Sequence, residues 1–266
     1  MAEHAENVAS YTLRAKLDPV AHTVHGGGTI TWRNASSKPV SELWMHLYLN
    51  AFKNQSSVFM RAPIGGFRGN RIPTDWGSID LKKLVLVDGE KRDDLLGVVE
   101  LKRPGDEDET DARIPLPREV EPGEQITLEV EWVDKLPTIV ERTGYDGSFH
   151  MVGQWFPKIA KLEAEGPFAH FPFHHLGEFY SDFGTYDVTI DVPDGFIVGA
   201  TGPVVETKRE SGRLVQRHVQ SDIHDFAWTA WDKFQVRKET ILGVDVTVLA
   251  PPGYDDHVER ELETMR

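Results

Sequence analysis

The sequence predicts a mainly β protein: a large antiparallel, twisted or saddle-shaped β-sandwich, with the start of a helix at the C-terminus. Apolar residues recur at every second position in about a dozen segments, which is the period of a half-buried strand. Turn residues separate these segments at the spacing expected of a sandwich or a large sheet. A helical period appears only after residue 250.

Composition excludes several classes of site and partner. The chain has 266 residues and no cysteine, so disulfides, thiol catalysis and zinc–thiolate sites are excluded. A formal net charge of −14 argues against nucleic acid, which needs a basic surface, and against anionic lipid. The first residues carry no signal-peptide pattern, and no apolar run reaches membrane-span length. We therefore expect a soluble chain, and the sequence leaves its cellular compartment open.

The first strands are expected where polar and apolar residues alternate. Tyr11 to Leu17 predicts a half-buried strand, and Gly26-Gly27-Gly28 is expected to break the chain before a strand over residues 29–33. Residues 43–49 are bulky on both faces, which predicts a strand that is covered on both sides. Further strands are expected over residues 79–87, 125–133, 186–192, 204–208, 213–219, 226–231, 234–241 and 244–250.

Two segments predict loops. Residues 52–78 are irregular and carry their own aromatic side chains, which is typical of a functional loop or a lid. The acidic run over residues 106–111 lacks the glycine and the final glutamate of a calcium loop, so we interpret it as a solvated surface loop.

The C-terminal segment changes character. Pro251-Pro252-Gly253 ends the β region, and Asp255 or Asp256 is expected to cap a helix. Val258, Leu262 and Met265 fall on one face of that helix and need something to pack on. We therefore divide the chain into a β-domain over residues 1–250 and, over 251–266, a linker with the first helix of a further, truncated domain.

Some residues are of the types that bind metals or catalyse hydrolysis, but the sequence around them lacks the local structure that such sites need. Four residues of types that bind zinc lie close together in the sequence: His170, His174, His175 and Glu178. Pro172 and Gly177 make a regular helix there improbable, so we expect these histidines to line a loop and predict no metal site in this chain. Asp146, Ser148 and His150 contain the side chains of a hydrolytic triad, yet no Gly-x-Ser-x-Gly elbow surrounds the serine, and we expect no nucleophile.

Several segments, in order, resemble the N-terminal β-domain of the aminopeptidase N family of zinc metallopeptidases, the gluzincins. They are Tyr11-x-Leu-x-x-x-Leu-Asp18, Val24-x-Gly, Thr29-Ile-Thr-Trp-Arg-Asn34, Glu42-Leu-Trp-Met-His-Leu-Tyr-Leu-Asn50, Gln154-Trp-Phe-Pro157, Phe183-Gly-Thr-Tyr-Asp-Val-Thr-Ile-Asp-Val-Pro193, Val198-Gly-Ala-Thr-Gly202 and His224-Asp-Phe-Ala-Trp228. The resemblance covers nearly the whole chain and rests on the order and spacing of these segments.

The resemblance implies a multidomain zinc aminopeptidase in which this part is not catalytic. The family holds zinc with His-Glu-x-x-His and a downstream glutamate, whereas no histidine of this chain is followed by glutamate. We therefore expect no cofactor and no catalytic residue in this chain, and zinc in the missing catalytic domain. Without zinc ligands the chain alone should not hydrolyse peptides.

The resemblance also implies a role in substrate binding. The family's domain packs against its own catalytic domain, walls one side of the substrate cleft and places a polar group near the free amine of the peptide. The corresponding segment supplies the candidates Glu141, Tyr145, Asp146, Phe149, His150, Met151 and Gln154. The expected partners are the chain's own catalytic domain and the N-terminus of a peptide substrate.

Two alternatives remain open from the sequence. The chain could be a freestanding β-sandwich that binds another molecule, or the scaffold domain of an inactive homologue. A freestanding module is not expected to expose Val258, Leu262 and Met265, so the environment of the C-terminal helix separates the first alternative from the peptidase interpretation.

Overall fold

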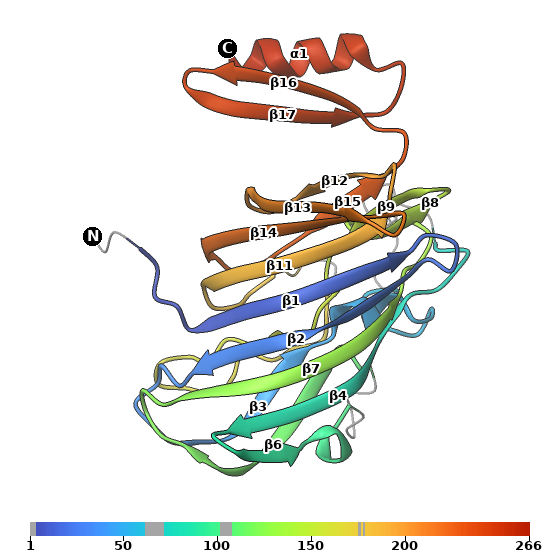
Figure 1. The fold of residues 1–266 in the computed structure, drawn as a ribbon. Helices are drawn as coiled ribbons and strands as arrows, with labels where there is room; N and C mark the ends of the chain where they lie inside the picture. The colour runs from blue at the N-terminus through green and yellow to red at the C-terminus, as the bar shows by residue number, and fades with distance from the viewer. Residues whose placement is uncertain (1–3, 62–71, 102–107, 175–176, 178) are drawn as a thin grey trace.

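The computed structural model describes residues 4–61, 72–101, 108–174, 177 and 179–266. In these residues the strands form an eight-stranded sheet, two smaller sheets and a separate two-stranded hairpin, and one α-helix lies at the C-terminal end (Figure 1). The mainly β fold class that the period of two predicts is confirmed.

The eight-stranded sheet forms the frame of the molecule, with the strand order β13-β14-β11-β1-β2-β7-β4-β5. Its strands are β1 (Ala9–Asp18), β2 (Thr23–Arg33), β4 (Ser78–Asp88), β5 (Lys91–Asp94), β7 (Gln125–Lys135), β11 (Gly184–Pro193), β13 (Val204–Glu210) and β14 (Arg213–Ile223). Neighbouring strands are antiparallel except β1 and β11, which are parallel. The sheet twists continuously from β13 to β4 (Figure 1).

Two smaller sheets share one continuous apolar core with the large sheet. One has the order β10-β3-β6 and contains β3 (Val40–His46), β6 (Asp111–Val120) and β10 (Lys158–Ile159). The other has the order β12-β15-β9-β8 and contains β8 (Gly144–Asp146), β9 (Phe149–Val152), β12 (Ile197–Ala200) and β15 (Trp228–Trp231). Short 3-10 helices lie at η1 (Tyr48–Phe52) and η2 (Leu96–Val98).

The alternation along the strands divides the large sheet into a buried and an open face. On β1, Tyr11 and Leu13 are buried while Thr12 is exposed, as the period of two predicts. Tyr11 lies opposite Tyr186 of β11, and their rings stack with centroids 4.7 Å apart. Cross-strand aromatic pairs of this kind help to hold the register of adjacent strands.

The expected chain break at the three glycines of residues 26–28 is wrong, because these glycines lie inside β2. Gly26 lies opposite Trp132 of β7, and a Cβ at Gly26 would be 2.0 Å from the indole. A Cβ at Gly28, whose φ is +153°, would be 2.0 Å from the carbonyl oxygen of Thr12. The glycines are therefore needed for close packing of neighbouring strands, a role that glycine also takes in strand interiors.

The expected strand over residues 43–49 ends early. β3 stops at His46, and the chain turns into the 3-10 helix η1 from Tyr48. Residues 43–52 are all buried, so the apolar pattern carries no period that could mark the change. The turn places Phe52, the last residue of η1, on the side of the molecule where the candidate site lies.

The C-terminal residues form a unit that projects from the body (Figure 1) and touches it where Leu249 packs on Gly199. It contains β16 (Gln235–Ile241), β17 (Val244–Ala250) and α1 (Asp255–Met265). The expected aspartate cap is wrong: Tyr254 is the N-cap and makes no side-chain capping bond. Leu262 is buried and Met265 is 46% exposed. The division of the chain at residue 250 stays a prediction. No helix among the described residues is long and apolar enough to cross a bilayer.

A buried carboxyl group lies at the end of β7. Asp134 is fully buried, and its Oδ2 accepts a hydrogen bond from Nε1 of Trp132 at 3.2 Å. Its Oδ1 has no hydrogen-bond partner among the described residues. Burial raises the pKa of Asp134 well above the ordinary value. The folded protein therefore holds this proton more tightly than the unfolded chain does.

We expect Asp134→Asn to stabilise the protein at alkaline pH. A raised carboxyl pKa contributes stability that is complete below the unfolded pKa, near 3.9, and is lost as pH rises toward the folded value. The amide cannot ionise, so the free energy of unfolding at pH 8 should rise by about 1–3 kcal/mol. Urea denaturation between pH 4 and 8 measures the difference between variant and wild type. A difference that stays constant with pH would contradict the assignment, and surface Asp146→Asn is the control.

Candidate functional site

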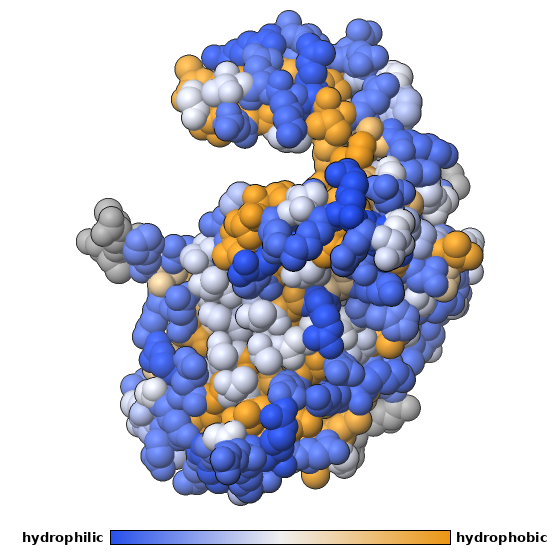
Figure 2. Space-filling view, in the orientation of Figure 1, coloured by the Kyte–Doolittle hydropathy of each residue, from blue (hydrophilic) through white to orange (hydrophobic). Residues whose placement is uncertain are grey.

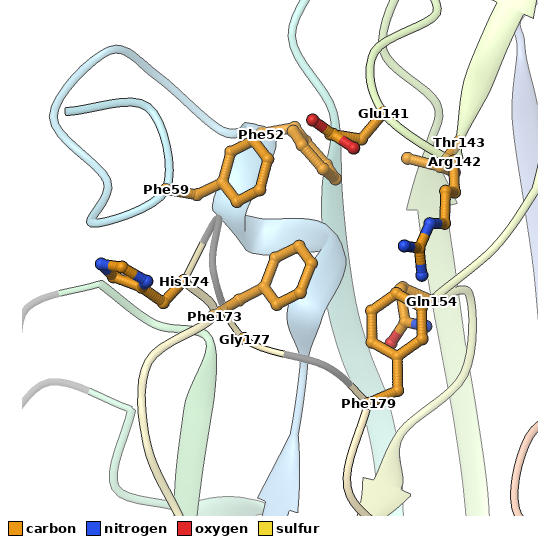
Figure 3. A pocket seen from close by; sticks show the side chains of 10 residues that line it. All are labelled: Phe52, Phe59, Glu141, Arg142, Thr143, Gln154, Phe173, His174, Gly177 and Phe179. Atoms are coloured by element: carbon orange, nitrogen blue, oxygen red, sulfur yellow. The ribbon is translucent and has the colours of Figure 1, made fainter. Parts of the chain in front are cut away.

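The candidate site is an aromatic pocket formed by segments that are far apart in the sequence. The pocket is lined by η1, the segment that carries Phe59, the turn before β8 and Gln154 after β9, together with Phe173, His174, Gly177 and Phe179 (Figure 3). The enclosed part of the pocket has a cavity volume of about 20 Å³, and it opens into a wider space of about 380 Å³ that includes solvent. One side is apolar, and the other carries charged and amide side chains.

Four phenylalanines make the apolar side. The rings of Phe59 and Phe173 stack with centroids 5.1 Å apart, Phe52 meets Phe59 edge-on at 5.1 Å, and Phe179 lies 5.6 Å from Phe173. Phe52, Phe59 and Phe173 are nearly buried, so their contacts fix one another's orientation. The pocket wall is thus built before any ligand arrives, as in most small-molecule sites.

A tight turn carries the first polar group. Val140 and Thr143 exchange backbone hydrogen bonds of 3.0 and 3.1 Å, which leaves Glu141 and Arg142 at the tip. Glu141 has a φ of +48°, a left-handed conformation that is uncommon for residues other than glycine. Its carboxylate lies beside the ring of Phe52 in Figure 3. The turn therefore holds an acidic group at one end of the aromatic wall.

The bend after β9 carries the second polar group. Gln154 also has a left-handed φ, +55°, and is 7% exposed. Gly153 precedes it, and a Cβ there would be 2.7 Å from the carbonyl oxygen of Arg142. Thr143 Oγ1 donates to the carbonyl oxygen of Gly153 at 3.0 Å. The glycine thus lets the bend approach the turn, so that Glu141 and Gln154 line one pocket.

Two cationic side chains at the edge of the pocket contact the ring of the same phenylalanine. The guanidinium carbon of Arg142 lies 5.4 Å from the centroid of Phe179, and the ammonium nitrogen of Lys158 lies 5.7 Å from it. Lys158 is nearly buried and its Nζ is 2.7 Å from Oδ1 of Asp225. Aromatic faces attract cations, so these contacts orient Phe179 and hold positive charge behind the ring.

Tyr145 and His150, two of the residues expected at the site, belong to a different cluster. The ring of His22 stacks on Tyr145 at 3.5 Å, and its Nδ1 is 3.1 Å from Nε2 of His150. Nδ1 of His150 donates to the carbonyl oxygen of Ser148 at 2.9 Å, so Nε2 is the acceptor and His22 the donor. Burial lowers the pKa of His150 to about 4, which keeps its ring neutral at physiological pH.

The remaining expected residues lie outside the pocket. Asp146 is exposed on β8, Phe149 packs edge-on against Trp231 at 5.7 Å, and Met151 is half-buried on β9. Of the seven residues expected from the sequence, the structure brings Glu141 and Gln154 together. The alternation of β9 places His150 on the opposite face from Phe149 and Met151, and neither face lines the pocket.

The hydrolytic and metal-binding alternatives gain no geometric support. Ser148 Oγ donates to Asp232 at 2.5 Å, while Nδ1 of His150 bonds the backbone oxygen of Ser148, so these side chains form no nucleophile–base pair. His170 bonds Asp111 at 2.8 Å, whereas His174 lines the pocket. His175 and Glu178 lie outside the described residues. No three His, Asp or Glu side chains within the described ranges are arranged to hold a metal ion.

Sequence reasoning missed the aromatic wall and the residue that supports Gln154. Phe52 and Phe59 fall in the irregular segment whose aromatic side chains are typical of a functional loop, so a signal existed for them. Phe173 and Phe179 belong to a Gly/Pro/His-rich connection without a periodic pattern, so only tertiary structure could place them. Asp225, which pairs with Lys158, lies in the segment His224–Trp228 that carries part of the family resemblance, but nothing in that segment indicates its contact with Gln154.

Compared with models of known protein families, the chain matches none, and no curated protein matches it at a significant level.

We expect Glu141→Gly to stabilise the protein. Glycine adopts a left-handed φ without steric cost, so the free energy of unfolding should rise by about 0.5–1 kcal/mol. Ser211→Gly is the matched control, because Ser211 has a φ of +52° in the exposed turn between β13 and β14. Guanidinium denaturation compares the variants. A loss of stability in Glu141→Gly alone would show that the side chain, and not the backbone, governs the turn.

Proposed function

We propose that this chain is the non-catalytic substrate-cleft domain of a zinc aminopeptidase-like protein and that its aromatic pocket receives the free amine end of a peptide. The observation that carries the proposal is the convergence of Glu141 and Gln154 on one apolar pocket. Both have left-handed backbone conformations. Residues held in costly conformations are concentrated at ligand-binding sites, because the surrounding fold must enforce them.

The chemistry of the pocket suits a primary ammonium group. The Glu141 carboxylate accepts hydrogen bonds and carries the complementary charge, while the phenylalanine faces attract cations and the apolar atoms attached to them. A hydrogen bond to a charged group contributes about 1.5–3 kcal/mol. A neutral analogue of the ligand would lose that contribution and keep only the apolar contacts.

Peptide hydrolysis itself is assigned to another part of the parent protein. When bound, zinc would supply an activated water molecule for attack on the peptide bond. The described residues offer no group that fits the ion. In the proposal this chain therefore binds and orients the substrate, and the metal is held by the catalytic domain that the family resemblance implies.

The C-terminal unit supports the proposed partner domain. β16, β17 and α1 project from the body, and on one side a hollow lies between them and the body in Figure 2, while Leu249 of β17 packs on Gly199 of β12. A two-stranded sheet is marginally stable by itself. Val236, Val244 and Met265 are exposed on this unit. In the proposal, the catalytic domain covers these residues and continues the unit.

One observation favours the alternative of a freestanding binding module. Leu262 is buried within the C-terminal unit, and Val258 is half-buried, so α1 leaves less apolar surface open than the sequence predicts. The two interpretations differ in ligand and in context. A freestanding module needs neither an amine ligand nor a catalytic domain.

The ligand test uses two probes that differ in one group. Phenylalaninamide carries the ammonium, and 3-phenylpropanamide lacks it. We expect the chain to bind the former at least about tenfold more tightly, because only the ammonium can pair with Glu141. Glu141→Gln should remove most of this preference, whereas Glu90→Gln, at an exposed turn, should not. Isothermal titration calorimetry measures the six affinities of the three proteins for the two probes. Equal binding of the two probes by the wild-type chain would reject the proposal.

The proposed catalytic domain is tested by sequencing the gene beyond codon 266. We expect the reading frame beyond codon 266 to encode His-Glu-x-x-His within roughly a hundred residues, a motif that needs its own helix. The longer protein should release amino acids from anilide substrates and lose this activity to a chelator, while the present chain should show none. Hydrolysis by the present chain alone, or a reading frame without the motif, would contradict the assignment.

A further inference from the structure

The buried environment of Gln154 determines which end of its amide faces the pocket. Nε2 of Gln154 lies 3.2 Å from Oδ2 of Asp225. A carboxylate only accepts hydrogen bonds, so the amide must turn its NH2 group toward Asp225. Figure 3 shows the result: the amide oxygen lies on the side of Phe173, and the nitrogen points away.

The amide oxygen of Gln154 is left for a ligand. Within the described residues it accepts no hydrogen bond, and it is not one of the fully buried polar atoms that lack a partner, so it is accessible from the pocket. An accessible carbonyl oxygen of this kind bonds water until a donor group of a ligand replaces it. An acceptor aimed into a pocket that already contains the Glu141 carboxylate selects a ligand that donates several hydrogen bonds.

Asp225 is itself held in a fixed orientation. Its Oδ1 lies 2.7 Å from the ammonium nitrogen of Lys158 and accepts a hydrogen bond from the backbone N–H of Phe226 at 2.8 Å. Lys158 is nearly buried on β10, so its charge requires a counterion at this place. With Oδ1 engaged by both groups, Oδ2 is the atom that meets Gln154.

The geometry points to Asp225 as a positioning residue that sets ligand specificity through Gln154. Lys158 and Phe226 orient the carboxylate, the carboxylate orients the amide, and the amide presents an oxygen to the pocket. This inference rests on the proposed function for the identity of the ligand, a primary ammonium. The orientation of the amide rests on the contacts of Gln154 alone.

The substitution Asp225→Asn should reverse the orientation of the Gln154 amide. Lys158 and the N–H of Phe226 still require an acceptor, so the oxygen of the introduced amide faces them and its NH2 group faces Gln154. Gln154 must then turn its own oxygen toward the introduced amide and its NH2 group toward the pocket. The pocket changes from an acceptor to a donor at this point, which disfavours an ammonium ligand.

The first measurement needs no ligand. The side-chain amide signals of Gln154, assigned by their loss in Gln154→Leu, report the bond to Asp225 in ¹H–¹⁵N spectra. We expect a protected amide proton in the wild-type chain and its loss in Asp225→Asn. Asp232→Asn is the matched control, since Asp232 accepts from Ser148 and has no contact with Gln154. Unchanged Gln154 signals in Asp225→Asn would overturn the inference.

The second measurement compares the affinities of the variants for the two probes. The preference for phenylalaninamide over 3-phenylpropanamide should fall about tenfold in Asp225→Asn and stay unchanged in Asp232→Asn. Should Asp225→Asn fold poorly because Lys158 loses its counterion, Asp225→Asn with Lys158→Met removes both charges and keeps the Phe226 contact. A preference that survives in a folded variant would overturn the inference. Equal binding of both probes by the wild-type chain would instead reject the proposed function, and the amide signals would still decide the role of Asp225.

Discussion

The arrangement of the site depends on two hydrogen bonds of buried indole groups. Nε1 of Trp132, on the large sheet, donates to the carbonyl oxygen of Trp155 at 2.6 Å, and Nε1 of Trp155 donates to the carbonyl oxygen of Phe226 at 3.0 Å. Trp155 directly follows Gln154 in the chain, and Phe226 directly follows Asp225. Because all three rings are buried, the bonds cannot be exchanged for bonds to water without leaving polar groups unsatisfied. The large sheet therefore fixes both partners of the Gln154–Asp225 contact at once.

The pocket combines a rigid apolar wall with backbone conformations that cost free energy. Stacked phenylalanines supply the wall, and the left-handed residues Glu141 and Gln154 supply the polar ends. The turn of Glu141 is closed by backbone bonds, and the bend of Gln154 is possible because Gly153 leaves room beside Arg142. The core of the surrounding sheets compensates for this local cost, a distribution that is common where a fold maintains a binding site.

The sequence predicts the strands better than it predicts what they bring together. The period of two identifies β1 and β7 because one face of each is buried and the other is not. It fails at β2, where the glycines at 26–28 look like a turn until Trp132 is seen across from Gly26. For the site, the segment 141–154 is close enough in the chain to be singled out, whereas Phe52 and Asp225 join it only through tertiary packing.

The position of β1 has a consequence for how the chain acquires its structure. This first strand lies in the interior of the large sheet, between β2 and β11, and pairs Tyr11 with Tyr186 in a parallel register. During synthesis β1 can pair with β2 almost at once, but its other edge stays open until β11 has left the ribosome. Folds dominated by such distant pairings form slowly, and an unpaired edge is open to wrong partners. The hairpin of β1 and β2 therefore carries an open edge until β11 is available to pair with it.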